Sequence, residues 1–152
     1  MCGLAAIYAY SGDAPPVNEA ALAACNARMI RRGPDAEGSW VSGDGRVGLA
    51  HRRLAIIDLD DRAAQPMSLT DGGPRIDITY NGEIYNFREI REELKSFGYS
   101  FLSDSDTEVV IKAFHYWGAK AFNKFNGMFS IVVYDTQDET LILARDRAGV
   151  KP

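Results

Sequence analysis

The feature that most restricts the fold is a strand–turn–strand pattern near the end of the sequence. Residues 128–134 form an apolar run typical of a buried strand, residues 135–138 supply turn-forming side chains, and residues 141–144 are apolar again. A turn this short joins antiparallel strands, because parallel strands need a crossover of a dozen residues or more. The chain is therefore expected to contain antiparallel sheet.

Other segments repeat this mixture of strands and helices. Apolar or alternating runs predict further strands at residues 3–10, 46–50, 53–58 and 76–80. Capping residues and apolar stripes predict three helices. The first follows Asn18 and has Leu22, Cys25 and Met29 on one face; the second follows Asn86, has an apolar stripe of Phe87, Ile90, Leu94 and Phe97, and ends at Gly98. The third begins at the capping box Ser105-Asp106-Thr107-Glu108, ends at Gly118, and points Val109, Val110, Ala113, Phe114 and Trp117 inward. Strands in runs with helices between them predict an α+β fold rather than a doubly wound parallel sheet.

Composition excludes several classes of protein. A chain of 152 residues with 46% hydrophobic and 25% charged residues is ordinary for one globular domain. A net charge of −4 gives no electrostatic footprint for nucleic acid or anionic membranes. Two cysteines and two histidines make neither a disulfide framework nor a four-cysteine zinc site, so no metal is expected. The sequence has no signal peptide pattern, and a cytoplasmic location is expected.

Three motif-like patterns are better explained by local structure. Residues 43–48 match G-x-G-x-x-G, but strand-like residues follow, which favours a hairpin turn at residues 42–45 over a dinucleotide site. Asp104, Asp106 and Glu108 alternate like cation ligands, yet acidic groups also suit a helix N-terminus. Asp106 stays open as a carboxylate facing a cleft. The acidic residues within 58–61 are predicted to form a solvated turn.

The histidines are weak catalytic candidates. His115 lies off the apolar stripe of its helix, which predicts surface exposure. His51 lies beside two arginines and carries no partner signature. A Ser-His-Asp or Cys-His arrangement therefore has little support.

Cys2 is the strongest catalytic candidate. Removal of Met1 would place a free α-amine and a thiol on one residue. An α-amine has an ordinary pKa of roughly 7.7–8.0, so it can act as a general base near neutral pH. Taken alone, Cys2 is better explained as a small apolar residue at the start of a core strand.

The sequence Tyr80-Asn81-Gly82-Glu83 has two interpretations. Asn-Gly is the strongest short signal for a type I′ hairpin turn, and on local grounds that interpretation is favoured. Alternatively, the side-chain amide of Asn81 and the backbone N–H of Gly82 are two donors suited to an oxyanion hole.

Together these pieces make the sequence similar to the N-terminal glutaminase domain of asparagine synthetase. That domain is a class II glutamine amidotransferase of the N-terminal-nucleophile (Ntn) hydrolase type. The matching motifs span the chain in the order of the family: Cys2-Gly3, Arg32-Gly33-Pro34-Asp35, Arg53-Leu54-Ala55-Ile56-Ile57-Asp58, Gln65-Pro66-Met67, Tyr80-Asn81-Gly82-Glu83-Ile84-Tyr85-Asn86, Ser105-Asp106-Thr107-Glu108, Phe125-Asn126-Gly127-Met128-Phe129 and Arg145-Asp146-Arg147-Ala148-Gly149-Val150-Lys151-Pro152.

The resemblance implies a fold and a set of roles. The fold is an αββα four-layer sandwich of two antiparallel sheets flanked by helices. Cys2 is the implied nucleophile, and Asn81 with Gly82 the implied oxyanion hole. Substrate-binding roles fall on Arg53 for the α-carboxylate of glutamine, on Asp106 and Glu83 for its α-ammonium, and on a pocket-lining strand of Leu54, Ala55, Ile56 and Ile57.

The resemblance also implies partners. L-Glutamine is the substrate, and ammonia passes to an ATP-dependent synthetase domain that acts on aspartate in asparagine synthetase. No cofactor is expected for the glutaminase half, and ATP with Mg²⁺ belongs to the synthetase domain. Residues 1–152 are expected to be a glutaminase domain truncated at its C-terminus, with the synthetase domain absent; a homodimer is compatible with this. The alternatives are a non-catalytic binding or scaffold module, and an amidotransferase domain that serves a sugar, peptide or cell-wall precursor.

Two departures from the family pattern concern Arg31 and Met1. Arg31 stands where many members have histidine, which changes little. A retained Met1 would bury the required α-amine in a peptide bond, so the expected active form lacks it.

Overall fold

The chain folds into four layers, as the resemblance implies. The computed structural model describes residues 2–70, 73 and 75–152. Its regular elements are, in order, β1 (Gly3–Tyr8), α1 (Glu19–Arg28), β2 (Ala36–Val41), β3 (Val47–Arg53), the 3-10 helix η1 (Asp61–Ala63), β4 (Met67–Leu69), β5 (Ile76–Ile84), α2 (Phe87–Ser96), α3 (Asp106–Trp117), the 3-10 helix η2 (Gly118–Asn123), β6 (Gly127–Asp135) and β7 (Thr140–Arg145).

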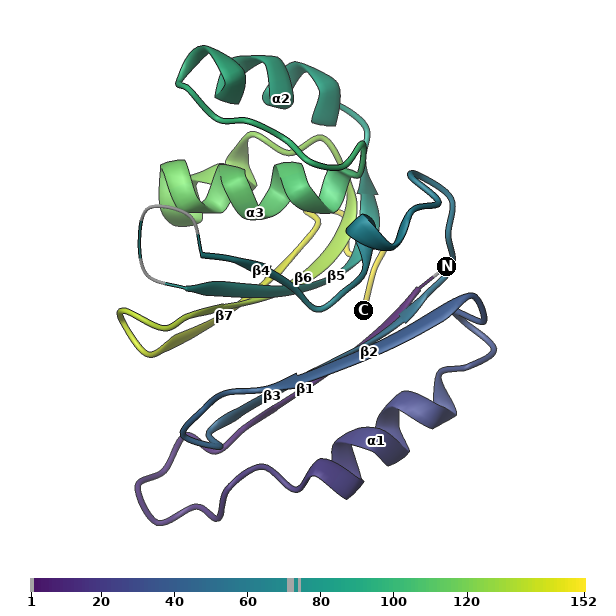
Figure 1. Ribbon diagram of the computed structural model, residues 1–152, viewed down its shortest axis with the longest axis vertical. Helices are drawn as coiled ribbons and strands as arrows, with labels where there is room; N and C mark the ends of the chain where they lie inside the picture. The colour runs from purple at the N-terminus through teal and green to yellow at the C-terminus, as the bar shows by residue number, and fades with distance from the viewer. Residues whose placement is uncertain (1, 71–72, 74) are drawn as a thin grey trace.

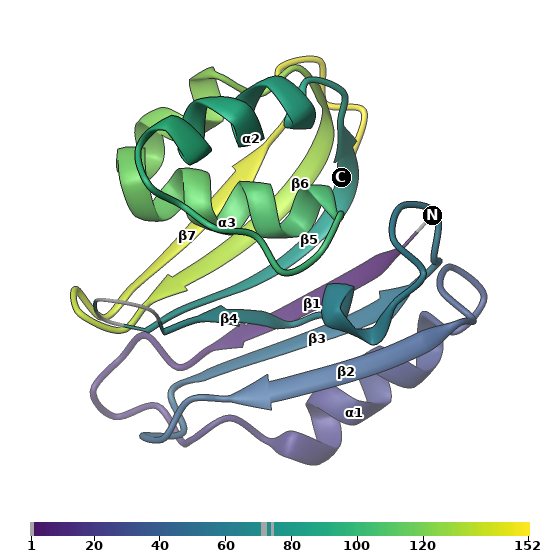
Figure 2. The same ribbon diagram turned by 45° about the horizontal axis from the view of Figure 1, so that its top comes forward.

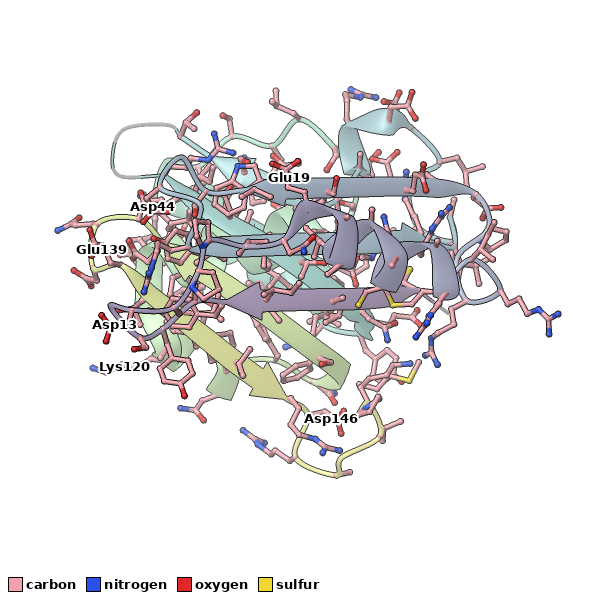
Figure 3. The ribbon with its side chains drawn as sticks, turned by 90° about the horizontal axis from the view of Figure 1, so that it is seen from below. Asp13, Glu19, Asp44, Lys120, Glu139 and Asp146 are labelled. Carbon is pink, nitrogen blue, oxygen red and sulfur yellow. The ribbon has the colours of Figure 1, made fainter. Side chains whose placement is uncertain are left out.

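Two antiparallel sheets lie face to face at the centre of these layers. The first has strand order β1-β3-β2 and the second β4-β5-β6-β7. Helix α1 covers the outer face of the first sheet, while α3, with α2 beyond it, covers the second (Figures 1 and 2). Figure 3 views the molecule from the α1 side, with Glu19 at the start of that helix. The α+β fold with antiparallel sheets is therefore confirmed.

The strands alternate between two environments, as a period of two requires. Along β5, Ile78, Tyr80 and Ile84 point to the helices and join the larger core, which is completed by α2, α3 and β6. Along β3, Val47 and Leu49 point to the second sheet and form a smaller core between the sheets with residues of β6. The same alternation places His51 and Arg53 in the space between the sheets.

Local rules located two helix starts correctly. The Asn18 side chain accepts the N–H of Ala21 at the start of α1. Ser105 accepts the N–H of Glu108 at the start of α3, but the Glu108 carboxylate binds the N–H groups of Leu102 and Ser103, so the capping box is only partly formed. Gly118 ends α3 with φ +58°, as predicted.

Several detailed expectations about the helices were wrong. Cys25 is exposed, and the buried face of α1 carries Leu22 and Asn26 instead. Asn86 precedes α2, but its side chain binds the carbonyl of Lys124 and the N–H of Asn126 rather than capping the helix. Phe97, at the end of the same helix, is 46% exposed.

His115 is half-buried rather than exposed. Its Nδ1 lies 2.5 Å from the Tyr99 hydroxyl.

The strand predictions also needed corrections. Residues 54–58 form no strand, because β3 ends at Arg53. The predicted turn at Asn81-Gly82 lies inside β5, where Asn81 pairs with Ser130 and Gly82 with Phe129. Strands β2 and β4 carried no recognised signal. By contrast, the turn expected at residues 42–45 is present between β2 and β3.

Candidate active site

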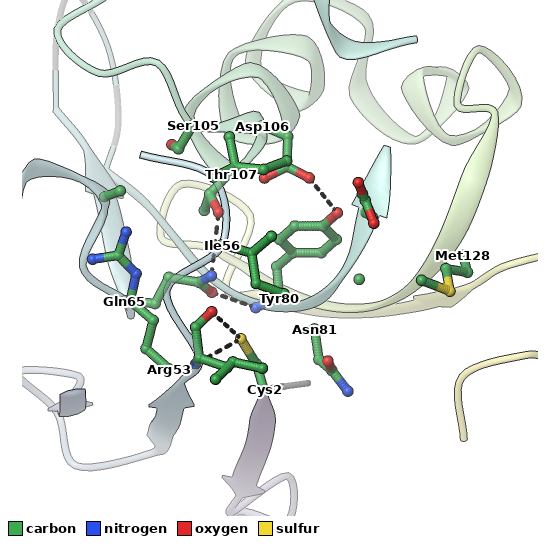
Figure 4. A pocket seen from close by; sticks show the side chains of 15 residues that line it. Cys2, Arg53, Ile56, Gln65, Tyr80, Asn81, Ser105, Asp106, Thr107 and Met128 are labelled. Atoms are coloured by element: carbon green, nitrogen blue, oxygen red, sulfur yellow. Dashed lines mark hydrogen bonds between the residues drawn. The ribbon is translucent and has the colours of Figure 1, made fainter. Parts of the chain in front are cut away.

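The Cys2 thiol lies at the point where β1 begins and β3 ends. Its Sγ accepts the backbone N–H of Leu54 at 3.3 Å and lies 3.7 Å from the Leu54 carbonyl oxygen. Arg32 Nε donates to the Cys2 carbonyl oxygen at 3.1 Å. The half-buried thiol is thus held between the two chain segments, facing the pocket shown in Figure 4.

The Arg-Gly-Pro-Asp segment fixes the chain beside that thiol. Gly33 packs so closely on Arg52 that a Cβ there would lie 2.3 Å from the Arg52 carbonyl carbon. The Asp35 N–H donates to the Arg53 carbonyl at 3.0 Å, and its carboxylate accepts the N–H of Ala55 at 2.8 Å. The segment therefore holds the loop after β3 in place.

Arg53 is a buried cation at the pocket wall. It is 7% exposed, and its terminal N–H groups donate to the main-chain carbonyls of Asp60, at 3.0 Å, and Asp58. Main-chain acceptors orient the guanidinium without neutralising its charge. The group is therefore suited to an incoming carboxylate.

Asn81 and Gly82 face the pocket from β5. Asn81 is 5% exposed, and a Cβ on Gly82 would lie 2.3 Å from the Met128 carbonyl oxygen. In Figure 4, Cys2 and Asn81 lie on one side of the β5 ribbon, and Asp106 lies on the other. Both residues nevertheless line the same pocket.

Asp106 is the first residue of α3 and is 6% exposed. Its Oδ2 accepts the Tyr80 hydroxyl at 2.7 Å and the Ile84 N–H at 3.2 Å. Burial raises the pKa of this carboxyl, whereas the hydrogen bonds from Tyr80 and Ile84 act in the opposite direction. Burial also raises the pKa of the Tyr80 phenol well above its ordinary value, so the phenol remains the donor.

His51 joins the sheets behind the pocket. Its Nε2 lies 3.1 Å from the Tyr80 carbonyl oxygen, and because a carbonyl can only accept, Nε2 carries the proton. Burial, opposed by this hydrogen bond and assisted by the charge of Arg53, lowers the pKa of His51 to about 4. The ring is neutral at pH 7 and serves as a structural donor.

One pocket brings together most of the residues that the sequence proposed. Cys2, Arg53, Leu54, Ile56, Ile57, Asn81, Gly82, Glu83 and Asp106 all line it, whereas Ala55 does not. The sequence assigned no catalytic or substrate-binding role to six other lining residues: Ala63, Gln65, Tyr80, Ser105, Thr107 and Met128. All but Ala63 belong to the motifs that carry the family resemblance.

The pocket therefore combines a thiol, a cation and two carboxylates. Arg53 can bind a carboxylate, while Asp106 and Glu83 can bind an ammonium group. The four-layer fold and this combination of groups are those that the resemblance to glutamine amidotransferase domains implies.

Sequence comparisons identify the family. A profile of the glutamine amidotransferase domain matches residues 1–152. The chain is 38% identical, over all of its length, to "Asparagine synthetase [glutamine-hydrolyzing] 1" of Bacillus subtilis and covers 23% of that protein. It is 36% identical over its whole length to "Putative asparagine synthetase [glutamine-hydrolyzing]" of Mycobacterium tuberculosis and covers 25% of it. The chain belongs to the glutamine amidotransferase domain family, whose members are enzymes, and spans about a quarter of the length of these relatives.

A structural comparison supports the fold. The glutamine phosphoribosylpyrophosphate amidotransferase of Bacillus subtilis, solved with ADP and GMP, matches 71% of this chain and 25% of its own, with a TM-score of 0.60 and 22% identity. In the described part of the chain, no helix is long and apolar enough to cross a membrane.

Proposed function

We propose that the chain hydrolyses L-glutamine to glutamate and ammonia, with Cys2 as an N-terminal nucleophile. The observation that carries the proposal is the shared pocket. Cys2, Asn81, Gly82 and Arg53 line the same cavity, together with the carboxylate of Asp106. Family membership and the similarity to glutamine-hydrolysing synthetases support this assignment.

Binding follows from the charges of the pocket. Arg53 holds the α-carboxylate of glutamine, and Asp106 with Glu83 holds the α-ammonium. The hydrogen bonds that the guanidinium donates to the Asp58 and Asp60 carbonyls keep it in position before substrate arrives. The side-chain amide of the substrate then extends toward Cys2.

The chemistry needs the α-amine of Cys2, so Met1, which lies outside the described residues, is removed in the active form. The amine accepts the thiol proton, and Sγ attacks the amide carbon of glutamine. Asn81 Nδ2 and the Gly82 N–H donate to the oxyanion. The C–N bond breaks as the protonated amine returns its proton to the leaving ammonia. Water then attacks the γ-glutamyl thioester, releasing glutamate and restoring the thiol.

The ammonia is supplied to an ATP-dependent domain of the asparagine synthetase type. The length of the relatives supports a further domain, since the chain covers only 23–25% of them. In this proposal residues 1–152 are the glutaminase part, ATP and Mg²⁺ act in the second domain, and the glutaminase site needs no cofactor. We place the protein in the cytoplasm.

Glutamate release from glutamine is the direct test. The protein without Met1, confirmed by mass, is expected to release glutamate, and Cys2→Ala is expected to abolish release while retaining glutamine binding. Cys25→Ala is the matched control, because Cys25 is exposed and outside the pocket. Release that survives in Cys2→Ala would refute the nucleophile. Binding without any release by the folded, processed protein would instead favour a binding module.

A further inference from the structure

Gln65 occupies the place of a missing strand partner beside the oxyanion hole. Strand β4 pairs with β5 from Leu69↔Ile76 to Met67↔Ile78. The same register, continued by two residues, would set residue 65 opposite Tyr80. The backbone ladder stops first, and the side-chain Oε1 of Gln65 accepts the Tyr80 N–H at 2.6 Å instead.

The other end of the Gln65 amide reaches α3. Its Nε2 donates to Thr107 Oγ1 at 3.2 Å, and Thr107 directly follows Asp106. The Gln65 main chain is confined as well, because a Cβ on Gly38 of β2 would lie 2.1 Å from its carbonyl oxygen. Gln65 is 8% exposed. The Gln65 side chain thus joins the second sheet to α3 (Figure 4), and its main chain lies against β2 of the first sheet.

Tyr80 is consequently held at three points. Its N–H binds Gln65, its carbonyl binds His51 and its hydroxyl binds Asp106. The two residues that follow are the oxyanion donors Asn81 and Gly82. If the β5 backbone shifted at Tyr80, the next two residues would move with it, and both donors would move away from Cys2.

We propose that Gln65 is a positioning residue for the reaction, holding β5 so that Asn81 and Gly82 face Cys2. The inference rests on the proposed glutaminase function. An amide suits the position because it accepts at one end and donates at the other. A misplacement of about 1 Å can cost about 100-fold in rate, so a tight anchor next to the donors has a large effect.

The test uses Gln65→Met in the intact protein without Met1. Methionine has a similar length and can replace neither hydrogen bond. We expect kcat for glutamine hydrolysis to fall about 10- to 100-fold per active site, counted by stoichiometric alkylation of Cys2 in a Cys25→Ala background, because Cys25 is also a free, exposed thiol. In a Cys2→Ala background, the glutamine Kd should change less than about threefold. Gln137→Met is the matched control, because Gln137 is exposed in the turn after β6.

A double-mutant cycle with Asn81→Ala separates positioning from general damage. If Gln65 acts through the oxyanion hole, the loss of kcat caused by Asn81→Ala shrinks about tenfold when Gln65 is already methionine. A merely structural role would leave the two losses multiplicative. Thr107→Val breaks only the bond to α3, and should lower kcat about threefold with the same non-additivity; it serves if Gln65→Met does not fold.

The results of these experiments distinguish a failure of the positioning role from a failure of the proposed glutaminase function. The positioning role is overturned by an unchanged kcat in Gln65→Met, by kcat losses that simply multiply when Asn81→Ala is added, or by an effect confined to the glutamine Kd. These outcomes leave the glutaminase itself intact, because the parent still releases glutamate. A parent as inactive as Cys2→Ala refutes the proposed function and, with it, this inference.

Discussion

Replacement of His51 is predicted to remove a specific part of the pH dependence of stability. In the folded protein, burial holds the pKa of His51 at about 4, against 6.5 for an unperturbed histidine. At pH values between about 4 and 6.5, His51 is protonated in the unfolded chain but not in the folded chain. The free energy of unfolding therefore falls as the pH falls from about 6.5 to about 4, and the full contribution is present above 6.5.

The magnitude follows from the two pKa values. One pKa unit is worth about 1.4 kcal/mol, so the difference amounts to about 3 kcal/mol by pH 4. That is a large part of the roughly 5–15 kcal/mol that stabilises a typical domain. Protonation or removal of the ring would also disturb the contact between Nε2 and the Tyr80 carbonyl oxygen.

Urea unfolding at a series of pH values from 7.5 to 4 tests this directly. His51→Gln retains an N–H donor but does not titrate, so its stability should fall about 3 kcal/mol less than that of the parent across this range. His115→Gln should keep the loss seen in the parent, because His51 is still present. Parallel stability curves for the parent and His51→Gln would refute the reasoning.

Two further predictions concern the pocket and its support. Arg53→Ala should raise the Kd of glutamine, measured in a Cys2→Ala background, about 30-fold or more, since truncation of one partner of a buried charge pair typically costs 2–5 kcal/mol; an unchanged Kd would remove Arg53 from substrate binding. Gly38→Ala should destabilise the protein by about 1–3 kcal/mol in urea unfolding, because its Cβ would meet the Gln65 carbonyl oxygen at 2.1 Å. Gly43→Ala, which has no atom within 4 Å of its Cβ, is the control, and equal losses in the two variants would contradict the steric argument.

Local capping rules predicted helices well because they depend on neighbours in the sequence. Asn18 and Ser105 cap helices through residues three positions away. The turn at Asn81-Gly82 was predicted by an equally local rule and is wrong. Strand β5 pairs with β6 over nine residues, from Ile76 to Ile84, and this pairing overrides the preference of Asn81-Gly82 for a turn. That pairing depends on a strand some fifty positions further along the chain, which local patterns do not contain.

The identities of the pocket residues came from the family motifs, and their supporting contacts came from the structure. Arg32, Gly33 and Asp35 carried the resemblance without an assigned task. Their bonds to Cys2 and Ala55, and the close packing on Arg52, are long-range contacts that no periodicity reveals. The position of Gln65 opposite Tyr80 likewise follows from a strand register, not from the motif Gln-Pro-Met.

One physical rule connects these contacts. A backbone N–H beyond the last paired residue of a neighbouring strand needs another acceptor, most of all where it is buried, as at Tyr80. Around this pocket, side chains take over: Cys2 Sγ accepts from Leu54, the Asp35 carboxylate from Ala55, and Gln65 Oε1 from Tyr80. The pairing of β3 and β4 thus ends beside the pocket, and Leu54 and Gln65, just beyond the paired residues, line it. The run at 53–58 was predicted as a strand for its apolar residues. The N–H groups of Leu54 and Ala55 instead bind the Cys2 thiol and the Asp35 carboxylate.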